Sequence, residues 1–200
     1  MSWSRSSKTS SYLVSASIAA VLLLFFYLLL SRMEYSWNWR VTWEYRQLFI
    51  QGFYYTAGIS FGAIGLGFLL GLAGGLARVS GSVFAREVSR IYVELFRGTP
   101  LLIQIYIFYF CIAPAIGYDN PPVIGTIALA AFSGAYITEI VRAGIESIGR
   151  GQMEAALSVG LTNRQAMRYV ILPQAFRRII PPVTGQFVSL IKDSSLLSVI

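Results

Sequence analysis

The sequence is divided by apolar stretches that are each about as long as a bilayer is thick. A helix needs roughly 20 predominantly apolar residues to span the hydrocarbon core of a membrane. Such stretches lie at residues 12–30, 54–77, 95–116, 123–141 and 174–192. Only 12% of the residues are charged, about half the usual fraction of a soluble domain. The sequence therefore predicts an all-α polytopic membrane protein with five spans.

Residue types that most enzymes use for metal binding or nucleophilic catalysis are scarce. The chain has no histidine and one cysteine, Cys111, in an apolar run. This excludes His/Cys metal sites, histidine-based nucleophiles and an internal disulfide, and Cys111 is interpreted as a small buried hydrophobe. Neither Lys8 nor Lys192 follows a glycine, so the GxxxxGK[ST] phosphate loop is missing. We expect a non-enzymatic chain without a metal, and any nucleotide that drives it is bound by another chain.

The first 53 residues precede the main apolar part of the chain. The polar segment 1–11 and the apolar run 12–30 are typical of a signal peptide or of an uncleaved first helix. The helix is favoured, because residues 31–34 offer no small-residue cleavage site. Segment 31–53 is predicted to be an interfacial or extracytoplasmic loop, with an aromatic ligand pocket as the alternative. This prediction rests on its rings, which are typical of the headgroup level, namely Tyr35, Trp37, Trp39, Trp43 and Tyr45.

The basic residues predict the orientation of the chain, since cytoplasmic segments are enriched in lysine and arginine. With a cytoplasmic N-terminus, twelve of the 16 basic residues fall inside and four outside. The inside set is Arg5, Lys8, Arg78, Arg86, Arg90, Arg97, Arg142, Arg150, Arg164, Arg168, Arg177 and Arg178. The outside set is Arg32, Arg40, Arg46 and Lys192. The net charge of +7 is therefore interpreted as a topology signal and not as nucleic-acid binding. Residues 78–97 are predicted to form a cytoplasmic loop leading into a helix that enters the membrane near Ile91.

Small residues recur along the second apolar stretch. Ala63, Gly67, Gly71 and Gly75 recur at every fourth position, and Gly58 and Gly62 add a second pair with the same spacing. Small residues at this spacing leave a groove in which another helix approaches closely. We predict that the helix over residues 54–77 packs against protein and not against lipid.

Residues 152–173 form a charged passage between two apolar stretches. An amphipathic helix is predicted by the apolar spacing of Met153, Ala156, Leu157, Gly160 and Leu161. Gly160 is its expected terminator. Thr162 and Gln165 have the spacing of a capping box, and the short helix that they begin is expected to end by Pro173. This pattern predicts either a docking element for a soluble partner or a basic amphipathic pair on the membrane surface.

Four motifs carry a resemblance that covers roughly residues 50–200. They are Glu154-Ala155-Ala156 followed by Gly160 and Leu172-Pro173, FRGTPLLIQ at 96–104, AYITEIVRAGIESI at 135–148 and KDSSLLSV at 192–199. In this order they resemble the motifs of ABC importer permeases of the polar amino acid family (histidine, glutamate, glutamine, arginine or opine type). The resemblance implies a type I, MetI-like helical bundle over 54–200 with an EAA coupling loop at 149–173. It makes 12–30 an extra N-terminal helix and implies that one more span is missing at the C-terminus.

The resemblance also implies a function and a set of partners. The chain is expected to be the permease subunit of an ATP-driven importer for polar or charged amino acids in a bacterial plasma (inner) membrane. Its implied partners are an ABC ATPase dimer holding ATP and magnesium, a second permease subunit that is identical or related, and an extracytoplasmic amino acid binding protein. The chain itself is expected to hold no cofactor. The implied coupling residues are Glu154, Ala155, Ala156, Leu157, Gly160, Leu161 and Pro173.

Polar groups near the membrane are candidates to line the solute route, because such groups are costly there and usually functional. The candidates are Gln104, Thr138, Glu139, Lys192, Asp193, Ser194 and Ser195. Glu139, Arg142 and Glu146 share one helical face, so an interfacial ion pair is the alternative for Glu139. A structural pair is the alternative for Lys192 and Asp193. An importer for another small solute, or a stand-alone channel, remains an alternative function.

Overall fold

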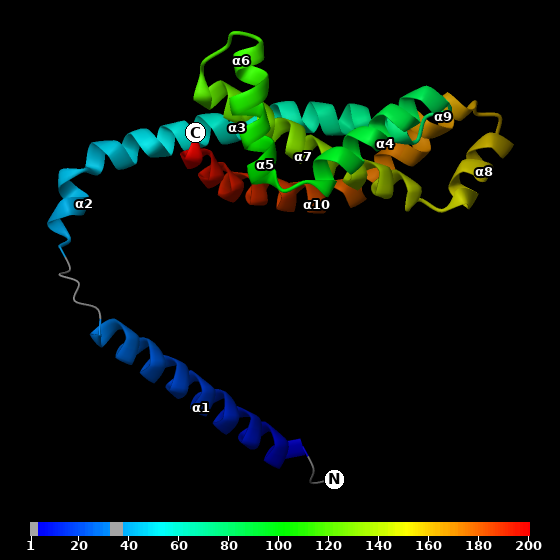
Figure 1. Cartoon of the computed structure of the whole chain (residues 1–200). Helices are drawn as coiled ribbons and strands as arrows, with labels where there is room; N and C mark the ends of the chain where they lie inside the picture. The colour runs from blue at the N-terminus through cyan, green and yellow to red at the C-terminus, as the bar shows by residue number, and fades with distance from the viewer. Residues whose placement is uncertain (1–3, 33–37) are drawn as a thin grey trace. The chain divides into compact units, whose positions relative to one another are not determined.

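The computed structural model describes residues 4–32 and 38–200, and every regular element in that part of the chain is helical. This confirms the predicted all-α fold. Figure 1 labels most of the elements by the names used below. The α-helices are α1 (Ser4–Ser31), α2 (Arg40–Glu44), α3 (Arg46–Arg78), α4 (Val83–Gly98), α5 (Leu101–Tyr106), α6 (Ala113–Ala115), α7 (Pro121–Glu146), α8 (Arg150–Ser158), α9 (Asn163–Ala166) and α10 (Leu172–Asp193). Two π-helical segments, η1 (Ile107–Ile112) and η2 (Met167–Ile171), and a 3-10 helix, η3 (Ser194–Val199), complete the set.

The chain divides into two compact units, residues 1–46 and 47–200, and each is described by itself. In the first unit, α1 covers the predicted span 12–30, and its apolar side chains are exposed, as they are in a helix surrounded by lipid. Helical structure resumes at α2, and α3 begins at Arg46, so residues 46–53 are helical in conformation. Tyr35 and Trp37 of the predicted aromatic loop, and the first three residues of the chain, lie outside the described residues.

Three helices of the described chain are long and apolar enough to cross a membrane. They are Ser10–Ser31, α3 and α7, and a fourth span results if α4 and Leu101–Ala115, which are bent by 107°, are counted together. The predicted fifth span, α10, is outside this group, so the five-span count stays a prediction. The helix α10 continues through Pro181 and Pro182. Proline removes a backbone donor, but its fixed φ is itself helical, so the chain stays coiled.

The helix α7 occupies the centre of the second unit and packs on α10 and α4 (Figure 1). One apolar cluster joins Ile137 and Val141 of α7 to Ile179 of α10. A second cluster, nearer the start of α7, joins Leu129 to Ala63 of α3 and to residues of α5 and the end of α10. The core of this unit is therefore organised around α7.

The glycine stripe of α3 packs directly on α7. The residues buried along α3 are Ser60, Ala63, Gly67, Gly71 and Gly75. A methyl group on Gly71 would overlap the side chain of Ile137 and lie 3.0 Å from the carbonyl oxygen of Gly134. A methyl group on Gly75 would overlap Val141 in the same way. The prediction that this helix packs against protein is confirmed.

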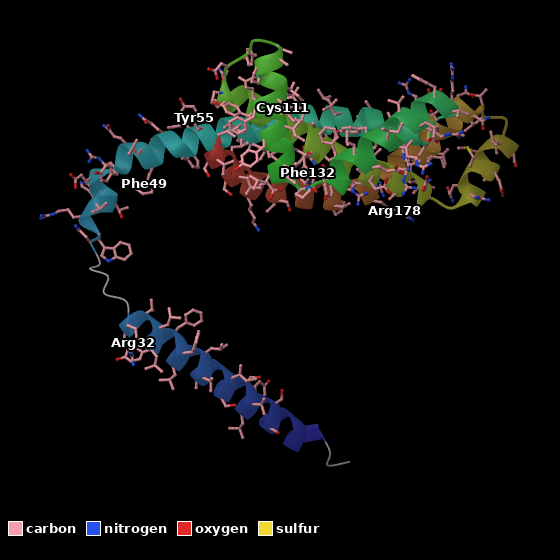
Figure 2. The ribbon with its side chains drawn as sticks, viewed as in Figure 1. Arg32, Phe49, Tyr55, Cys111, Phe132 and Arg178 are labelled. Atoms are coloured by element: carbon pink, nitrogen blue, oxygen red, sulfur yellow. The ribbon has the colours of Figure 1, made fainter. Side chains whose placement is uncertain are left out.

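Cys111 was predicted to be buried, and this prediction is wrong. The thiol lies exposed on η1 (Figure 2). The bend of 107° between α4 and the segment Leu101–Ala115 turns this part of the chain away from the direction of α4. In a membrane protein an apolar run indicates contact with lipid as readily as burial in protein.

Replacement of Gly71 by alanine tests the contact between α3 and α7. Because the added methyl overlaps Ile137, we expect a loss of about 1–3 kcal/mol of stability, measured by thermal unfolding of the purified protein in detergent. Gly65→Ala is the matched control, since nothing lies within 4 Å of a methyl group there. That control should be neutral or slightly stabilising, because alanine favours helix by about 1 kcal/mol over glycine. Equal midpoints for the two variants would contradict the contact.

Candidate functional site

The loop between α7 and α10, residues 149–173, has the capped helix–turn–helix conformation predicted for it. At the end of α8 the Gly160 N–H donates to the carbonyl oxygen of Leu157 (3.0 Å), and the Leu161 N–H donates to that of Ala156 (3.2 Å). This pair of bonds is the Schellman arrangement, which requires a left-handed residue, and Gly160 has φ +87°. Gly160 therefore ends α8, as predicted.

The second helix of the loop begins with the predicted capping box. The Thr162 N–H donates to Gln165 Oε1 (2.9 Å), and the Gln165 N–H donates to Thr162 Oγ1 (3.3 Å). Two backbone donors that the helix leaves unpaired are satisfied in this way. The turn between α8 and α9 is thus held by local bonds on both sides.

The prediction that this second helix ends by Pro173 is wrong. The chain passes from α9 through η2 directly into α10, with Pro173 in the first turn of α10. A π turn already departs from the regular i to i−4 bonding, and such turns accommodate a missing backbone donor. The proline is therefore tolerated inside a continuous helical path that links the loop to α10.

The predicted coupling residues divide between the two sides of α8. Ala156 is buried, and Met153 packs against the cluster formed by α7, η2 and α10. Glu154 and Ala155 are exposed on the opposite side. Gly151 and Ser158 lie on the same face at helical spacing, so most side chains of this exposed side are small.

The remaining predicted coupling residues lie around the turn and at the start of α10. Leu157, Gly160 and Pro173 are exposed and Leu161 is half-buried. Sequence reasoning did not single out Val159, whose side chain is 78% exposed. An apolar residue just before a terminating glycine was the available signal.

Two bonds tie the loop to α10. Arg178 Nη1 donates to the carbonyl oxygen of Ser147, just after α7 (2.7 Å; Arg178 is labelled in Figure 2). Gln174 Nε2 donates to Gln152 Oε1 on α8 (3.1 Å). The first bond joins α10 to the residue that follows α7, and the second joins α10 to α8 itself.

The predicted solute-route residues occupy three separate places, and the first is the bend between α4 and α5. Gln104 is buried there, and its Nε2 contacts the carbonyl oxygens of Phe96 (2.7 Å) and Thr99 (3.0 Å) and the Thr99 hydroxyl (2.8 Å). These contacts use the amide donors of Gln104 to fix the turn. Only its Oε1, which is buried without a partner among the described residues, is left for a solute.

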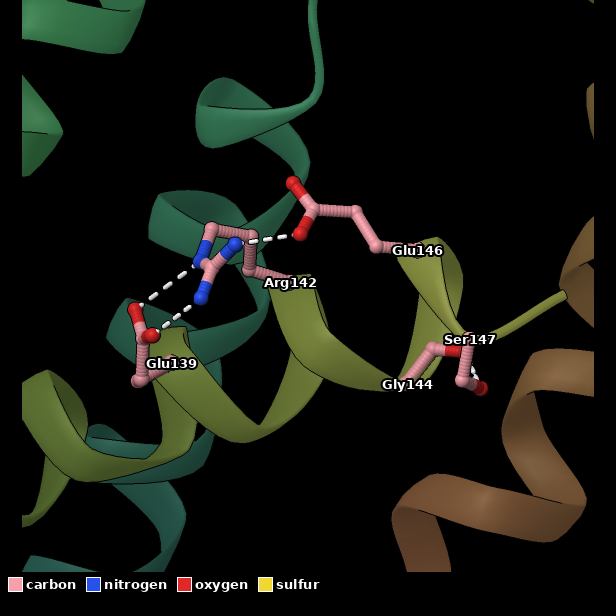
Figure 3. A network of polar contacts seen from close by, with 5 residues as sticks. All are labelled: Glu139, Arg142, Gly144, Glu146 and Ser147. Atoms are coloured by element: carbon pink, nitrogen blue, oxygen red, sulfur yellow. Dashed lines mark hydrogen bonds and ion pairs between the residues drawn. The ribbon is translucent and has the colours of Figure 1, made fainter.

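The second place is the C-terminal half of α7. Thr138 is fully buried against Gly74 of α3. Glu139 and Glu146 both pair with Arg142 (Figure 3), and one of the Glu139 contacts, from Arg142 Nε to Glu139 Oε2, measures 3.0 Å. Pairing on a shared helical face was predicted and is confirmed. This geometry favours the ion-pair reading of Glu139.

The third place is the end of α10 and the start of η3. Lys192 is exposed and Asp193 is half-buried. The hydroxyl groups of Ser194 and Ser195 donate to carbonyl oxygens of the preceding turn (2.7 and 2.8 Å). Both serines also line an open cavity of about 410 Å³ together with Tyr55 of α3. Two of the predicted solute-route residues thus border a cavity at this place.

Three polar contacts of α4 were missed by sequence reasoning. Ser89 Oγ donates to the Gly74 carbonyl oxygen (2.9 Å), and the Tyr92 hydroxyl donates to that of Ala131 (2.5 Å). The guanidinium of Arg97 lies 5.0 Å from the centre of the Tyr136 ring, a cation–π contact. Residues 78–97 were predicted to form a cytoplasmic loop leading into a helix that enters the membrane near Ile91, whereas the helix α4 already begins at Val83 and packs on α3 and α7. The sequence signal for this helix was the strongly amphipathic spacing of apolar and charged residues along 83–98.

Comparison with known proteins gives a consistent result. The family model described as "Binding-protein-dependent transport system inner membrane component" matches residues 63–200. The chain is 39% identical over 163 residues to the probable glutamine ABC transporter permease protein GlnM of Bacillus subtilis (strain 168), which covers 82% of this chain and 76% of GlnM.

Two solved structures are similar to the fold. A crystal structure of an amino acid ABC transporter with histidines has a chain that is 38% identical, with a TM-score of 0.76 over 82% of this chain and 77% of that chain. A chain of the MetNI methionine ABC transporter in an inward-facing conformation has a TM-score of 0.65 at 22% identity, over 80% of this chain and 76% of that chain. The second likeness concerns the fold alone, and it confirms the predicted MetI-like bundle.

Replacement of Gln104 by leucine tests its role at the bend. The variant keeps the volume but removes the donors, so the half-buried carbonyl oxygens of Phe96 and Thr99 lose their partner. We expect a loss of about 1–3 kcal/mol, seen in thermal unfolding, while Ile103→Leu on the same helix is nearly silent. A Gln104→Leu protein of native stability with altered solute dependence would instead assign Gln104 to the solute route.

Proposed function

This chain belongs to the family of binding-protein-dependent transport system inner membrane components and is a permease subunit of an amino acid ABC transporter; we propose that loop 149–173 couples it to an ATPase. In this proposal a dimer of ATPase subunits in the cytoplasm holds ATP and magnesium. The chain pairs with a second permease subunit, identical or related, and receives its solute from an extracytoplasmic binding protein. The N-terminus lies on the cytoplasmic side of a bacterial inner membrane.

The coupling role is supported by one observation: α8 has one side that is buried against the bundle and one side that is exposed and made mainly of small residues. Its inner side is anchored by Met153 and Ala156 in the core of the bundle. Its outer side presents the small residues Gly151, Ala155 and Ser158 beside the carboxylate of Glu154. A helix with a small outer side enters a cleft of a partner closely, and its anchored inner side carries the movement inward. A helix bound to the membrane surface presents large apolar groups to the lipid, whereas the exposed large apolar residues here, Leu157 and Val159, lie at the end of α8 and not on this small side.

The ties to α7 and α10 support the same role. The bond from Gln174 to Gln152 joins α10 to α8, and the bond from Arg178 to Ser147 joins α10 to the end of α7, just before the loop. Met153 of α8 also packs on the cluster formed by α7, η2 and α10, and coupling between sites is carried by packed side chains and hydrogen bonds of this kind. Closure of the ATPase would thus tilt α7 and α10 together and change access to the solute route.

We assign the outer part of that route to the end of α10 and to η3. The cavity lined by Ser194 and Ser195 is open and contains aromatic and hydroxyl groups, and Asp193 and Lys192 adjoin it in sequence. A zwitterionic amino acid presents one ammonium and one carboxylate group, which an Asp/Lys couple complements. Thr138 and Glu139 are assigned structural roles, because α3 covers the first and Arg142 pairs with the second.

Reconstitution tests the function. The chain should be placed in proteoliposomes with its ATPase, second permease subunit and binding protein, and uptake of labelled glutamine, glutamate, arginine and histidine should be followed. We expect uptake of at least one of these only when ATP and binding protein are both present. Uptake without the ATPase would identify a channel, and ATP-driven uptake of a different class of solute would overturn the amino acid assignment.

Replacement of Ala155 by glutamate tests the coupling surface. Ala155 is exposed, so the variant should fold and insert, but the added volume and charge on the small side of α8 should reduce ATPase co-purification at least tenfold. Gly160 is a poorer choice, because its φ of +87° makes any side chain there strained.

The matched control is Gly81→Glu, an exposed position in the turn between α3 and α4 with nothing within 4 Å of an added methyl group. It carries the same change of charge on the predicted cytoplasmic side and should leave co-purification intact. Similar losses in both variants, or none in Ala155→Glu, would count against the docking role of α8.

A further inference from the structure

The helix α4 has three different sides. One side packs on the bundle through Ser89, Tyr92 and the buried Val93. A second side is apolar and exposed, with residues at i, i+4, i+7 and i+11 that are 51–79% exposed, namely Phe84, Val88, Ile91 and Leu95. The third side is charged, and it is the one that needs an explanation.

The charged side of α4 consists of Glu87, Arg90 and Glu94. Arg90 Nε lies 2.7 Å from Glu94 Oε1, and Arg90 Nη1 lies 3.7 Å from Glu87 Oε2. The side chains remain 54–63% exposed in spite of this pairing. The three groups together carry both signs of charge.

The contacts of α4 place this exposed side at the level of the middle of α7. The Tyr92 hydroxyl reaches the carbonyl oxygen of Ala131, close to the middle of the 26-residue helix α7. Glu94 lies about 3 Å further along α4, since a helix rises 1.5 Å per residue. Because α7 is long and apolar enough to cross a membrane, Glu94 lies at a depth where lipid would otherwise surround it.

The charged side of α4 continues onto α7. Arg97, one turn beyond Glu94, stacks on Tyr136 of α7. The pair Glu139–Arg142 follows about one turn further along α7 (Figure 3). One polar surface therefore extends over two packed helices in the inner half of the bundle.

We propose that this polar surface lines a water-filled passage through which the amino acid leaves toward the cytoplasm. Lipid is excluded, because charged side chains at this depth face water or a polar partner. A second permease subunit is a poor cover for the charged side of α4, since burial of its three exposed charges carries a desolvation cost. The neighbouring apolar side of α4 suits such a subunit better. The carboxylate of Glu94 and the guanidinium groups of Arg90 and Arg97 complement the ammonium and carboxylate groups of a passing amino acid. This inference rests on the proposed function and adds α4 to the solute route.

The single native cysteine makes a direct test possible. In a Cys111→Ser background, Glu94→Cys and Leu95→Cys differ by one position and face the charged and the apolar side, respectively. Each is assembled with its partners in membrane vesicles and treated with a sulfonated, membrane-impermeant maleimide. We expect Glu94→Cys to react at least tenfold faster than Leu95→Cys, and its reaction to reduce amino acid uptake at least fivefold.

Equal labelling rates at the two positions, or full labelling of Glu94→Cys with uptake retained, would overturn the passage. The neighbouring pair Glu87→Cys and Val88→Cys repeats the comparison if a Glu94 variant fails to assemble. Uptake by the Cys111→Ser parent is measured first. A parent that takes up no amino acid contradicts the proposed function, whereas a transporting parent with equal labelling rates contradicts only this inference.

Discussion

The close approach of α3 to α7 is the contact on which the rest of the second unit depends. Apolar helices in lipid gain little from excluding solvent, so they associate through short-range packing. The stripe of Gly67, Gly71 and Gly75 supplies this on α3, and Ile137 and Val141 fill the groove. The other side of α7 uses the same arrangement reversed, because Gly144 of α7 receives Ile179 of α10. The helix α7 is thus held from two sides by glycines that lie on different helices.

The fixed position of α7 in turn defines how the loop after it behaves. The loop leaves α7 at Ser147 and returns through η2, and Arg178 bonds back to its starting point. The two ends of the loop are thus held together by this bond, and in the proposed function a force on α8 would act on α7 and α10 together. The weakest part of the path is the π turn of η2 followed by Pro173, where regular helical bonds are interrupted. We expect bending between the loop and α10 to concentrate there.

Features that depend on local spacing were predictable from the sequence, and those that depend on a neighbouring helix were not. The glycine repeat and the capping box of Thr162 and Gln165 are local patterns, and both are present in the structure. Gln104 was assigned to the solute route because it is polar within an apolar run. Its actual contacts with Phe96 and Thr99 depend on a bend that spacing does not reveal. Likewise, the contacts that place α4 alongside α7, from Tyr92 to Ala131 and from Arg97 to Tyr136, join residues far apart in the sequence.

The charged residues of the proposed passage, on α4 and on the C-terminal half of α7, share a property that bears on transport. Arg90 is paired with Glu87 and Glu94, Arg142 with Glu139 and Glu146, and Arg97 is stacked on Tyr136. A carrier must bind its solute strongly enough to admit it and weakly enough to release it. An unpaired charge would attract an oppositely charged group more strongly than a charge that already has a partner. Charges that already have partners give a passing amino acid polar contacts that replace part of its hydration. They do not form one site that binds it tightly. In the proposed passage, this pairing would therefore keep the wall permissive to an amino acid that passes along it.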